Sequence, residues 1–90
     1  MTNSTKTSLT EALEAIAPGD RSNSKVVGRK VGEISLPKGA SIGALVREDE
    51  IILPDADTVI ETDDHVIVFV PSRKQMPRVE KLFQVSASFF

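Results

Sequence analysis

The stretch His65-Val66-Ile67-Val68-Phe69-Val70 decides the fold. Its β-branched residues and its unbroken apolar run are typical of a central strand that is covered on both faces. Pro71 follows directly and predicts the end of the strand, because proline has no backbone N–H to donate to a neighbouring strand. The run is also far shorter than the roughly 20 residues that are needed to cross a bilayer. The sequence therefore predicts a buried sheet strand and no membrane-spanning segment.

The chain before this strand contains several shorter strand patterns. Residues 41–47 and 50–54 are rich in Ile, Leu and Val, and Glu48-Asp49 forms a tight polar link between them. Antiparallel pairing is the simplest arrangement for two strands that are joined in this way. Residues 58–60 form a further short extended segment, and acidic turns at 55–57 and 61–64 separate these pieces.

Helical patterns flank the strands. The last of them is an apolar stripe at helical spacing, formed by Met76, Val79, Leu82 and Phe83. Pro77 would cost roughly 3 kcal/mol beyond the first helical turn, so we expect the regular helix to begin only there. Apolar positions 27, 31 and 34 predict one or two helical turns within residues 25–34. Taken alone, residues 8–17 also favour a helix, because their apolar residues recur at helical spacing.

Composition limits the classes of function. The 90 residues suit a single domain with one modest core, and 40% apolar with 27% charged residues is ordinary for a globular protein. A formal charge of −2 argues against a surface that neutralises phosphates, so we expect no nucleic acid partner. The chain has no cysteine and one histidine, which leaves little for a zinc site or a disulfide framework.

Acidic pairs and the single histidine are the first candidates for chemistry. Asp55 with Asp57, and Asp63 with Asp64, could serve a metal or an acid/base reaction, but both pairs lie in predicted turns. Aspartates in turns usually accept hydrogen bonds from nearby backbone N–H groups, and we interpret both pairs in this way. His65 has no serine, cysteine or second histidine at a catalytic spacing, so it is interpreted as structural, with a pH-sensitive or ligand-contacting role as the alternative.

Arg47 differs from the other basic residues. It lies where the apolar strand 42–46 meets a polar turn, and an arginine there could clamp an anionic ligand through two parallel hydrogen bonds. An exposed or ion-paired arginine is the alternative. The glycines are scattered and form no G-x-G-x-x-G pattern that would cradle a dinucleotide phosphate. No nucleophile, base and oxyanion donor form a pattern that we can name, so we expect a protein that is not an enzyme.

The order of these pieces resembles a known family. Residues 26–39 read VVGRKVGEISLPKG and lead into IGALVR at 42–47 and TVIE at 58–61, and the more specific stretches are DDHV at 63–66 and VEKLFQ at 79–84. Together they closely resemble the C-terminal domain of TrkA, also called the RCK C-terminal domain, which regulates Trk-type potassium transporters. The resemblance spans about residues 11–90.

The resemblance implies the fold and its surroundings. It implies an α+β domain with a small, mostly antiparallel (mixed) sheet of about four to five strands, one short connecting helix and a C-terminal helix. The regulatory domain would span residues 9–90, after a flexible N-terminal tail at residues 1–8. The family makes residues 11–17 a strand, and we follow the family there. It also implies an N-terminal Rossmann domain in the whole subunit, so we expect no NAD or ATP binding in this chain.

The resemblance also implies partners and a site. It implies a homodimer through the sheet region and a membrane potassium transporter as client, which places the domain in the cytoplasm at the inner face of the membrane. Some relatives bind a small effector such as cyclic di-AMP between two paired copies, and by position that cleft would use Ile42, Leu45, Val46 and Arg47. Two alternatives are the regulatory domain of another carrier, such as a cation/proton antiporter, and a purely structural oligomerisation domain. Independently of the resemblance, we expect Phe89 and Phe90 to dock on the core or on a partner chain, because burying a phenylalanine side chain gains roughly 1.5–3 kcal/mol.

Overall fold

The computed structural model describes residues 11–84 of the 90-residue chain. Two expectations fall outside these residues: the flexible tail at 1–8, and the docking of Phe89 and Phe90. Among residues 11–84, no helix is both long enough and apolar enough to pass through a membrane.

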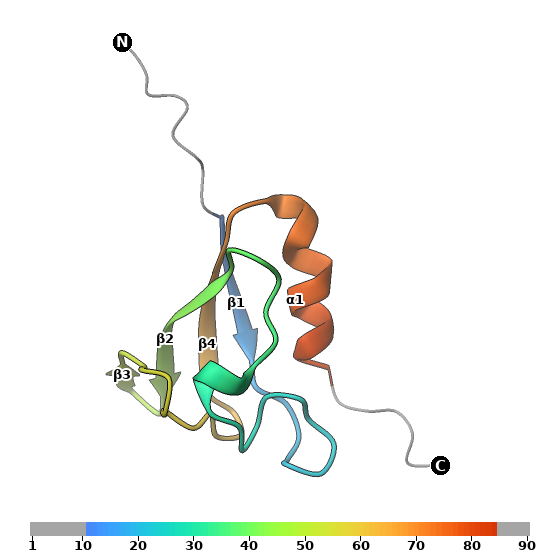
Figure 1. Ribbon diagram of the computed structural model, residues 1–90. Coiled ribbons are helices and arrows are strands. Elements are labelled where there is room, and N and C mark those ends of the chain that lie inside the picture. Colours follow the sequence, from blue (N-terminus) through green and yellow to red (C-terminus); the bar gives the residue numbers. More distant parts are fainter. Residues whose placement is uncertain (1–10, 85–90) are drawn as a thin grey trace.

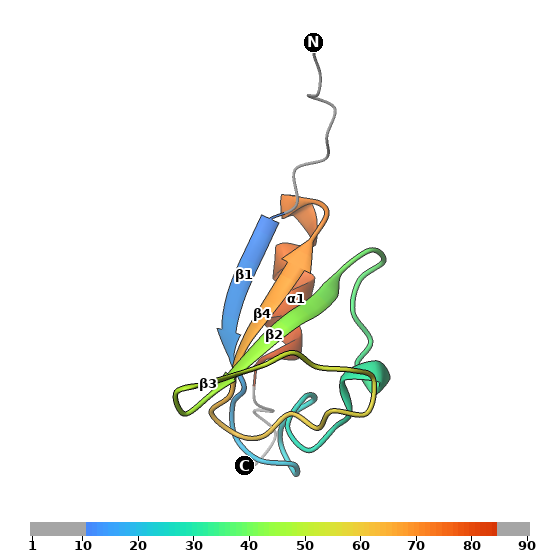
Figure 2. The same ribbon diagram turned by 90° about the vertical axis from the view of Figure 1, so that its left-hand side faces the viewer.

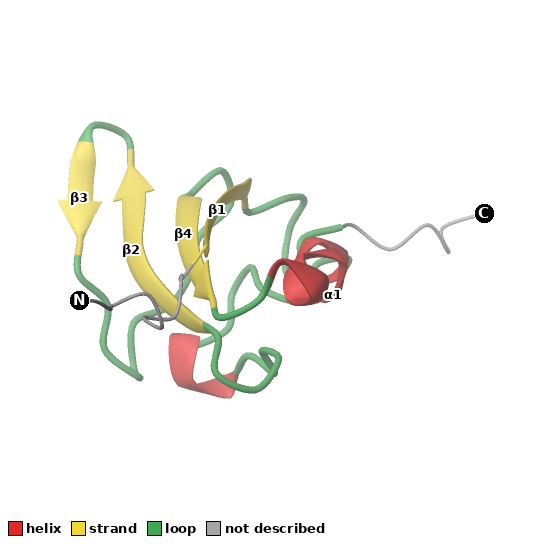
Figure 3. Ribbon diagram, turned by 90° about the horizontal axis from the view of Figure 1, so that it is seen from above, coloured by secondary structure: helices red, strands yellow, loops and turns green. Residues whose placement is uncertain are grey.

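A four-stranded antiparallel sheet forms one layer of the molecule (Figure 1). Its strands are β1 (Glu11–Ile16), β2 (Ser41–Arg47), β3 (Glu50–Ile52) and β4 (His65–Val70), in the spatial order β1-β4-β2-β3. The helix α1 (Met76–Leu82) forms a second layer against one face, as the view from above shows (Figure 3). The α+β architecture predicted from the sequence is confirmed.

Strand β4 lies in the interior of the sheet between β1 and β2, as its apolar run predicts. Its burial alternates, however. Val66, Val68 and Val70 have no exposed surface, whereas Phe69 on the opposite face is 40% exposed. The prediction that both faces are covered is therefore wrong. Among residues 11–84, helix α1 and the loops cover one face of β4, and its other face lies open towards the viewer in Figure 2.

The core lies on the covered face. The valines of β4 pack there with Leu45 of β2, Ile60, and Val79 and Phe83 from the region of α1. The loop between β1 and β2 adds Val26 and Val27, which are also buried. One modest core therefore joins the sheet, the helix and this loop, as the chain length leads one to expect.

Residues 11–16 form strand β1, so the helix favoured by the residues alone is wrong and the strand implied by the family is correct. Leu13 and Ala15 turn towards the core, and Ala12, Glu14 and Ile16 are exposed on the other face. The spacing of apolar residues in this segment fits both a helix and a strand. Pairing with β4 favours the strand, because all six residues pair, from Glu11 opposite Val70 to Ile16 opposite His65. Tertiary pairing therefore overrides local spacing.

The connection between β1 and β2 contains less helix than predicted. Only the single 3-10 turn η2 (Val31–Glu33) forms within residues 25–34. The Oγ of Ser24 accepts hydrogen bonds from the N–H groups of Val26 and Val27, which holds the chain in a tight loop. The predicted extended segment at 58–60 lies beside this loop through a bridge between Lys30 and Val59.

Helix α1 begins where Pro77 permits it. The 3-10 turn η3 (Arg73–Gln75) precedes α1, and the Oγ of Ser72 accepts a hydrogen bond from the N–H of Lys74. Pro77 occupies the first turn of α1, where its missing N–H costs no helical hydrogen bond. The start that the sequence predicts for this helix is confirmed.

Gly43 permits a bend in β2 below an aromatic ring. The pairing of β2 with β4 shifts register between Ile42 and Ala44, so Gly43 has the place of a bulge. A Cβ atom at this position would lie 2.1 Å from Cε2 of Phe69, which is closer than any real contact. The ring of Phe69 therefore covers the bare backbone at Gly43 on the open face of the sheet.

We predict that Gly43→Ala lowers the free energy of unfolding by about 1–3 kcal/mol, because the added methyl group displaces the ring of Phe69. In a Phe69→Ala background there is room for the methyl group, so the loss in free energy of unfolding caused by Gly43→Ala is smaller by at least about 0.5 kcal/mol. Urea unfolding of the two single variants and the double variant measures this coupling. Equal costs in both backgrounds would contradict the steric explanation.

Candidate functional site

Arg47, at the end of β2, is bound to a buried carboxylate. Its Nε donates to Oδ1 of Asp64 at 2.8 Å, and its second terminal nitrogen donates to Oδ2 of Asp64 at 2.7 Å. That terminal nitrogen also donates to the carbonyl oxygen of Val59 at 3.0 Å, and the other lies 3.2 Å from a carboxylate oxygen of Glu61. The Asp64 side chain is 0% exposed and that of Arg47 is 27% exposed. The pair is therefore a bidentate ion pair at the boundary of the core.

The backbone around Asp64 fixes this carboxylate in place. Asp63 has a positive φ of 69°, which turns the chain just before β4 begins. The N–H of Glu61 donates to Oδ2 of Asp64 at 2.9 Å, so the aspartate also closes its own turn. Ala17, after β1, donates its N–H to the carbonyl of Asp64 and accepts from the N–H of Asp63. The ion pair thus lies where the ends of β1, β2 and β4 meet.

The surroundings of Asp64 keep it ionised. Burial alone would raise the pKa of its carboxyl group, but hydrogen bonds from Arg47 and from the N–H of Glu61, with the positive charge of Arg47, lower the pKa below its ordinary value. The hydrogen bond to Asp64 likewise raises the pKa of Arg47. Both groups are therefore charged at neutral pH.

The four residues predicted to contact a ligand lie on one strand but not on one surface. Leu45 is completely buried in the core and Ile42, on the same face, is packed against it. Val46 lies opposite His65 on the open face of the sheet. Arg47 reaches from the end of β2 to the turn at Asp64. Val46 and the remaining exposed edge of Arg47 are thus the parts of this set that face solvent.

Apolar residues recur across the strands on the open face of the sheet, which is the face turned towards the viewer in Figure 2. One cross-strand row runs through all four strands, from Ile16 of β1 through His65 and Val46 to Ile51 of β3. Ile16 is 53% exposed and Ile51 is 71% exposed, and Leu53 beyond β3 is 81% exposed. Exposed apolar side chains that gather on one surface are characteristic of interaction sites.

His65 has a polar partner outside this row. Its Nδ1 lies 2.6 Å from a carboxylate oxygen of Glu14 on β1, and both side chains are partly exposed. His65 therefore joins the two strands at the open face.

The acidic pairs divide between two roles. Asp55 accepts hydrogen bonds from the N–H of Asp57 and the hydroxyl of Thr58, as the interpretation as a turn cap requires. Asp64 does accept from the backbone, but its bond to Arg47 was missed by the sequence reasoning. The available signal was an aspartate directly before a buried strand. Within residues 11–84, no group of three or more histidine or acidic side chains is placed to hold a metal ion.

We predict that Arg47→Ala lowers the free energy of unfolding by about 3–5 kcal/mol, because it leaves the Asp64 carboxylate buried without its counter-charge. Adding Asp64→Asn removes that charge, keeps an acceptor for Glu61, and restores part of the loss. Urea unfolding at neutral pH measures both. Arg73→Ala is the control: Arg73 is exposed and lies 3.7 Å from Glu11, so its loss costs about 0.5 kcal/mol or less. A similar cost for both arginines would refute the role of the buried pair.

The pH dependence of stability follows from the lowered pKa of Asp64. A carboxyl group whose folded pKa lies below its ordinary value of 3.8 stabilises the fold above that value, and this contribution is lost as the pH falls through the folded pKa. Asp64→Asn lacks this component. Acidification from about pH 7 to about pH 3 should therefore lower the urea midpoint less in Asp64→Asn than in the parent chain. An equal fall in both proteins would show that Asp64 does not contribute.

Comparisons with known proteins agree with this fold. The family model of the TrkA-C domain matches residues 18–84. The chain is 52% identical over 80 residues to the Trk system potassium uptake protein TrkA of Halomonas elongata, and 53% identical over 79 residues to that of Vibrio alginolyticus. These matches cover 89% and 88% of this chain but only 18% and 17% of the relatives. The chain thus spans less than a fifth of the length of these curated relatives.

Solved structures share the architecture. The RCK_C domain dimer of Streptococcus agalactiae BusR in complex with c-di-AMP aligns with a TM-score of 0.64 and 31% identity, over 80% of this chain and 93% of that one. An RCK domain solved with "cda" aligns with a TM-score of 0.66 over 81% of this chain and 97% of that one, but at 16% identity it supports the fold alone. The sheet order, the terminal helix and the match over residues 18–84 point the same way: the chain belongs to the TrkA-C domain family.

Proposed function

We propose that this chain is the regulatory, ligand-sensing and dimerisation domain of a potassium-uptake subunit of the Trk type. The observation that carries this proposal is the identity of more than half over 89% of the chain to a protein named for Trk potassium uptake. The whole subunit would add an N-terminal Rossmann domain and act on a membrane potassium transporter, from the cytoplasmic side. In this role the domain catalyses no reaction.

The open sheet face is the surface that we assign to dimerisation. Burying an exposed Leu or Ile side chain gains roughly 1.5–3 kcal/mol. In a two-fold dimer, this gain would be made once in each copy. Ile51 and Leu53 are the most exposed large apolar residues in the described part of the chain. The related BusR domain, 31% identical, is a dimer. These features support pairing of two copies across β2 and β3.

Ligand sensing would use the same strand. We assign the effector site to the region of Ile42, Leu45, Val46 and Arg47 from each copy, with a cyclic dinucleotide such as cyclic di-AMP as the candidate. Val46 offers an apolar contact, and the buried Leu45 and the partly buried Ile42 hold the strand from behind. One terminal nitrogen of Arg47 has only the exposed Glu61 as its partner in the described residues, so an anionic group could compete for it. A ligand bound between copies acts only through its different affinity for two arrangements of the dimer.

Ligand binding could affect the arrangement of the strands through the contacts of Arg47. Its guanidinium joins the end of β2 to the carbonyl of Val59 and to Asp64 at the start of β4. A ligand that draws Arg47 away from Glu61 would thus act on the turn that precedes the central strand. This arrangement favours sensing over a purely structural oligomerisation domain, which is one alternative. The other alternative is the regulatory domain of another cation transporter, such as a cation/proton antiporter.

We predict that the chain dimerises, that cyclic di-AMP binds the dimer, and that Ile51→Glu weakens both, because it places a charge in the apolar face. Sedimentation velocity measures the first effect and calorimetry the second. Gln84→Glu is the matched control, since it adds the same charge at an exposed position beyond α1 and should change neither. An intact dimer that binds no cyclic dinucleotide would favour the structural alternative. A monomer at all concentrations would refute the proposal.

A further inference from the structure

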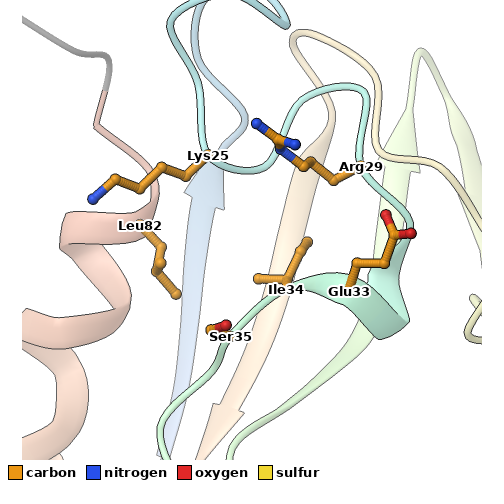
Figure 4. Close-up of a pocket in the computed structure, with 6 residues that line it drawn as sticks. All are labelled: Lys25, Arg29, Glu33, Ile34, Ser35 and Leu82. Atoms are coloured by element: carbon orange, nitrogen blue, oxygen red, sulfur yellow. The ribbon is translucent and has the colours of Figure 1, made fainter.

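A second surface lies on the side of the molecule that carries α1. A hollow of about 420 Å³ opens between the loop after β1 and the end of the helix, and Figure 4 shows the side chains that line it: Lys25, Arg29, Glu33, Ile34, Ser35 and Leu82. A neighbouring hollow of about 320 Å³ shares Lys25, Ser35 and Leu82 with it, and adds Pro37, Arg78 and Lys81. Because they share three lining residues, the two hollows form one continuous trough, which we call the α1 groove.

Positive charge is concentrated in the α1 groove. Four basic side chains line it, and Glu33 is the single acidic one. A carboxylate oxygen of Glu33 accepts a hydrogen bond from the N–H of Lys30. Within residues 11–84, none of the four basic side chains is in an ion pair, whereas Lys30, Arg47 and Arg73 are. A chain with a formal charge of −2 thus carries a local excess of positive charge at this groove.

The floor of the α1 groove is apolar and its rim is exposed. Ile34 and Leu82 are partly buried and pack against the core, and Pro37 is buried. The basic residues and Ser35 are exposed at the rim. A site for a small organic molecule usually encloses most of its ligand, and this shallow trough does not. Its shape and chemistry instead suit a polypeptide segment that lays apolar side chains on the floor and acidic side chains against the rim.

We propose that the α1 groove binds an acidic, partly apolar segment of a partner protein. Charge complementarity selects this partner, since the four basic side chains lack counter-charges within the described residues. The groove lies on the face of the sheet opposite to the proposed dimerisation surface, so the two sites can be occupied together. The proposal does not depend on the proposed function: it can hold in a chain that neither dimerises nor binds a cyclic dinucleotide.

The test adds a random copolymer of glutamate and tyrosine to the ¹⁵N-labelled chain. The copolymer supplies acidic side chains for the rim and aromatic side chains for the apolar floor. We expect amide shift changes gathered at Lys25, Ser35, Lys81 and Leu82. The double variant Arg78→Glu/Lys81→Glu should bind the copolymer at least ~10-fold more weakly, because two attractive contacts become repulsive. Lys38→Glu/Lys74→Glu is the matched control: it makes the same change in net charge at exposed positions outside the groove, and should retain affinity within about twofold.

Each other outcome counts against the proposal. Equal weakening in the two double variants would mean that only the net charge of the chain matters. Poly-L-glutamate binding as tightly as the copolymer would remove the role of the apolar floor. Shift changes at the groove with tripolyphosphate, but none with the copolymer, would assign the groove to a small phosphorylated ligand instead.

Discussion

The ion pair between Arg47 and Asp64 is the constraint on which the rest of the structure depends. A carboxylate with no exposed surface is tolerable only when its charge and its lone pairs are matched, and Arg47 and the N–H of Glu61 match them. The same contact holds the end of β2 against the start of β4, while the backbone of residues 63 and 64 holds the end of β1. The charged pair and the backbone hydrogen bonds beside it therefore set how β1, β2 and β4 meet at one end of the sheet.

The alternation of burial along β4 gives the sheet one face that is packed in the core and one face that is open. The valines at 66, 68 and 70 carry the core, and the residues between them leave an apolar face without a covering helix in the described residues. Under the proposed function, a second copy would cover this open face.

Much of the fold could be predicted from the sequence because strong local signals agreed with the tertiary structure. The run 65–70, the hairpin around Glu48-Asp49 and the proline at the start of α1 each have one favourable conformation. Residues 11–16 could not be assigned from spacing, since Leu13 and Ile16 fit a helix and only pairing with β4 decides. For the candidate site, Arg47 was identified as special, but its partner was not: an aspartate in a turn looks the same in sequence whether it is exposed or buried. That distinction depends on which chain segments pack over it.

The central position of β4 also has a consequence for how the chain acquires its structure. β1 and β2 both pair with β4, although β1 lies about fifty residues earlier in the sequence. Pairings between such distant segments raise the contact order, and they slow folding because a long loop must close before any gain is made. During synthesis, β2 can pair only with β3, and β1 lacks its partner β4, until residues 65–70 have left the ribosome. The sheet then assembles around its last-made strand.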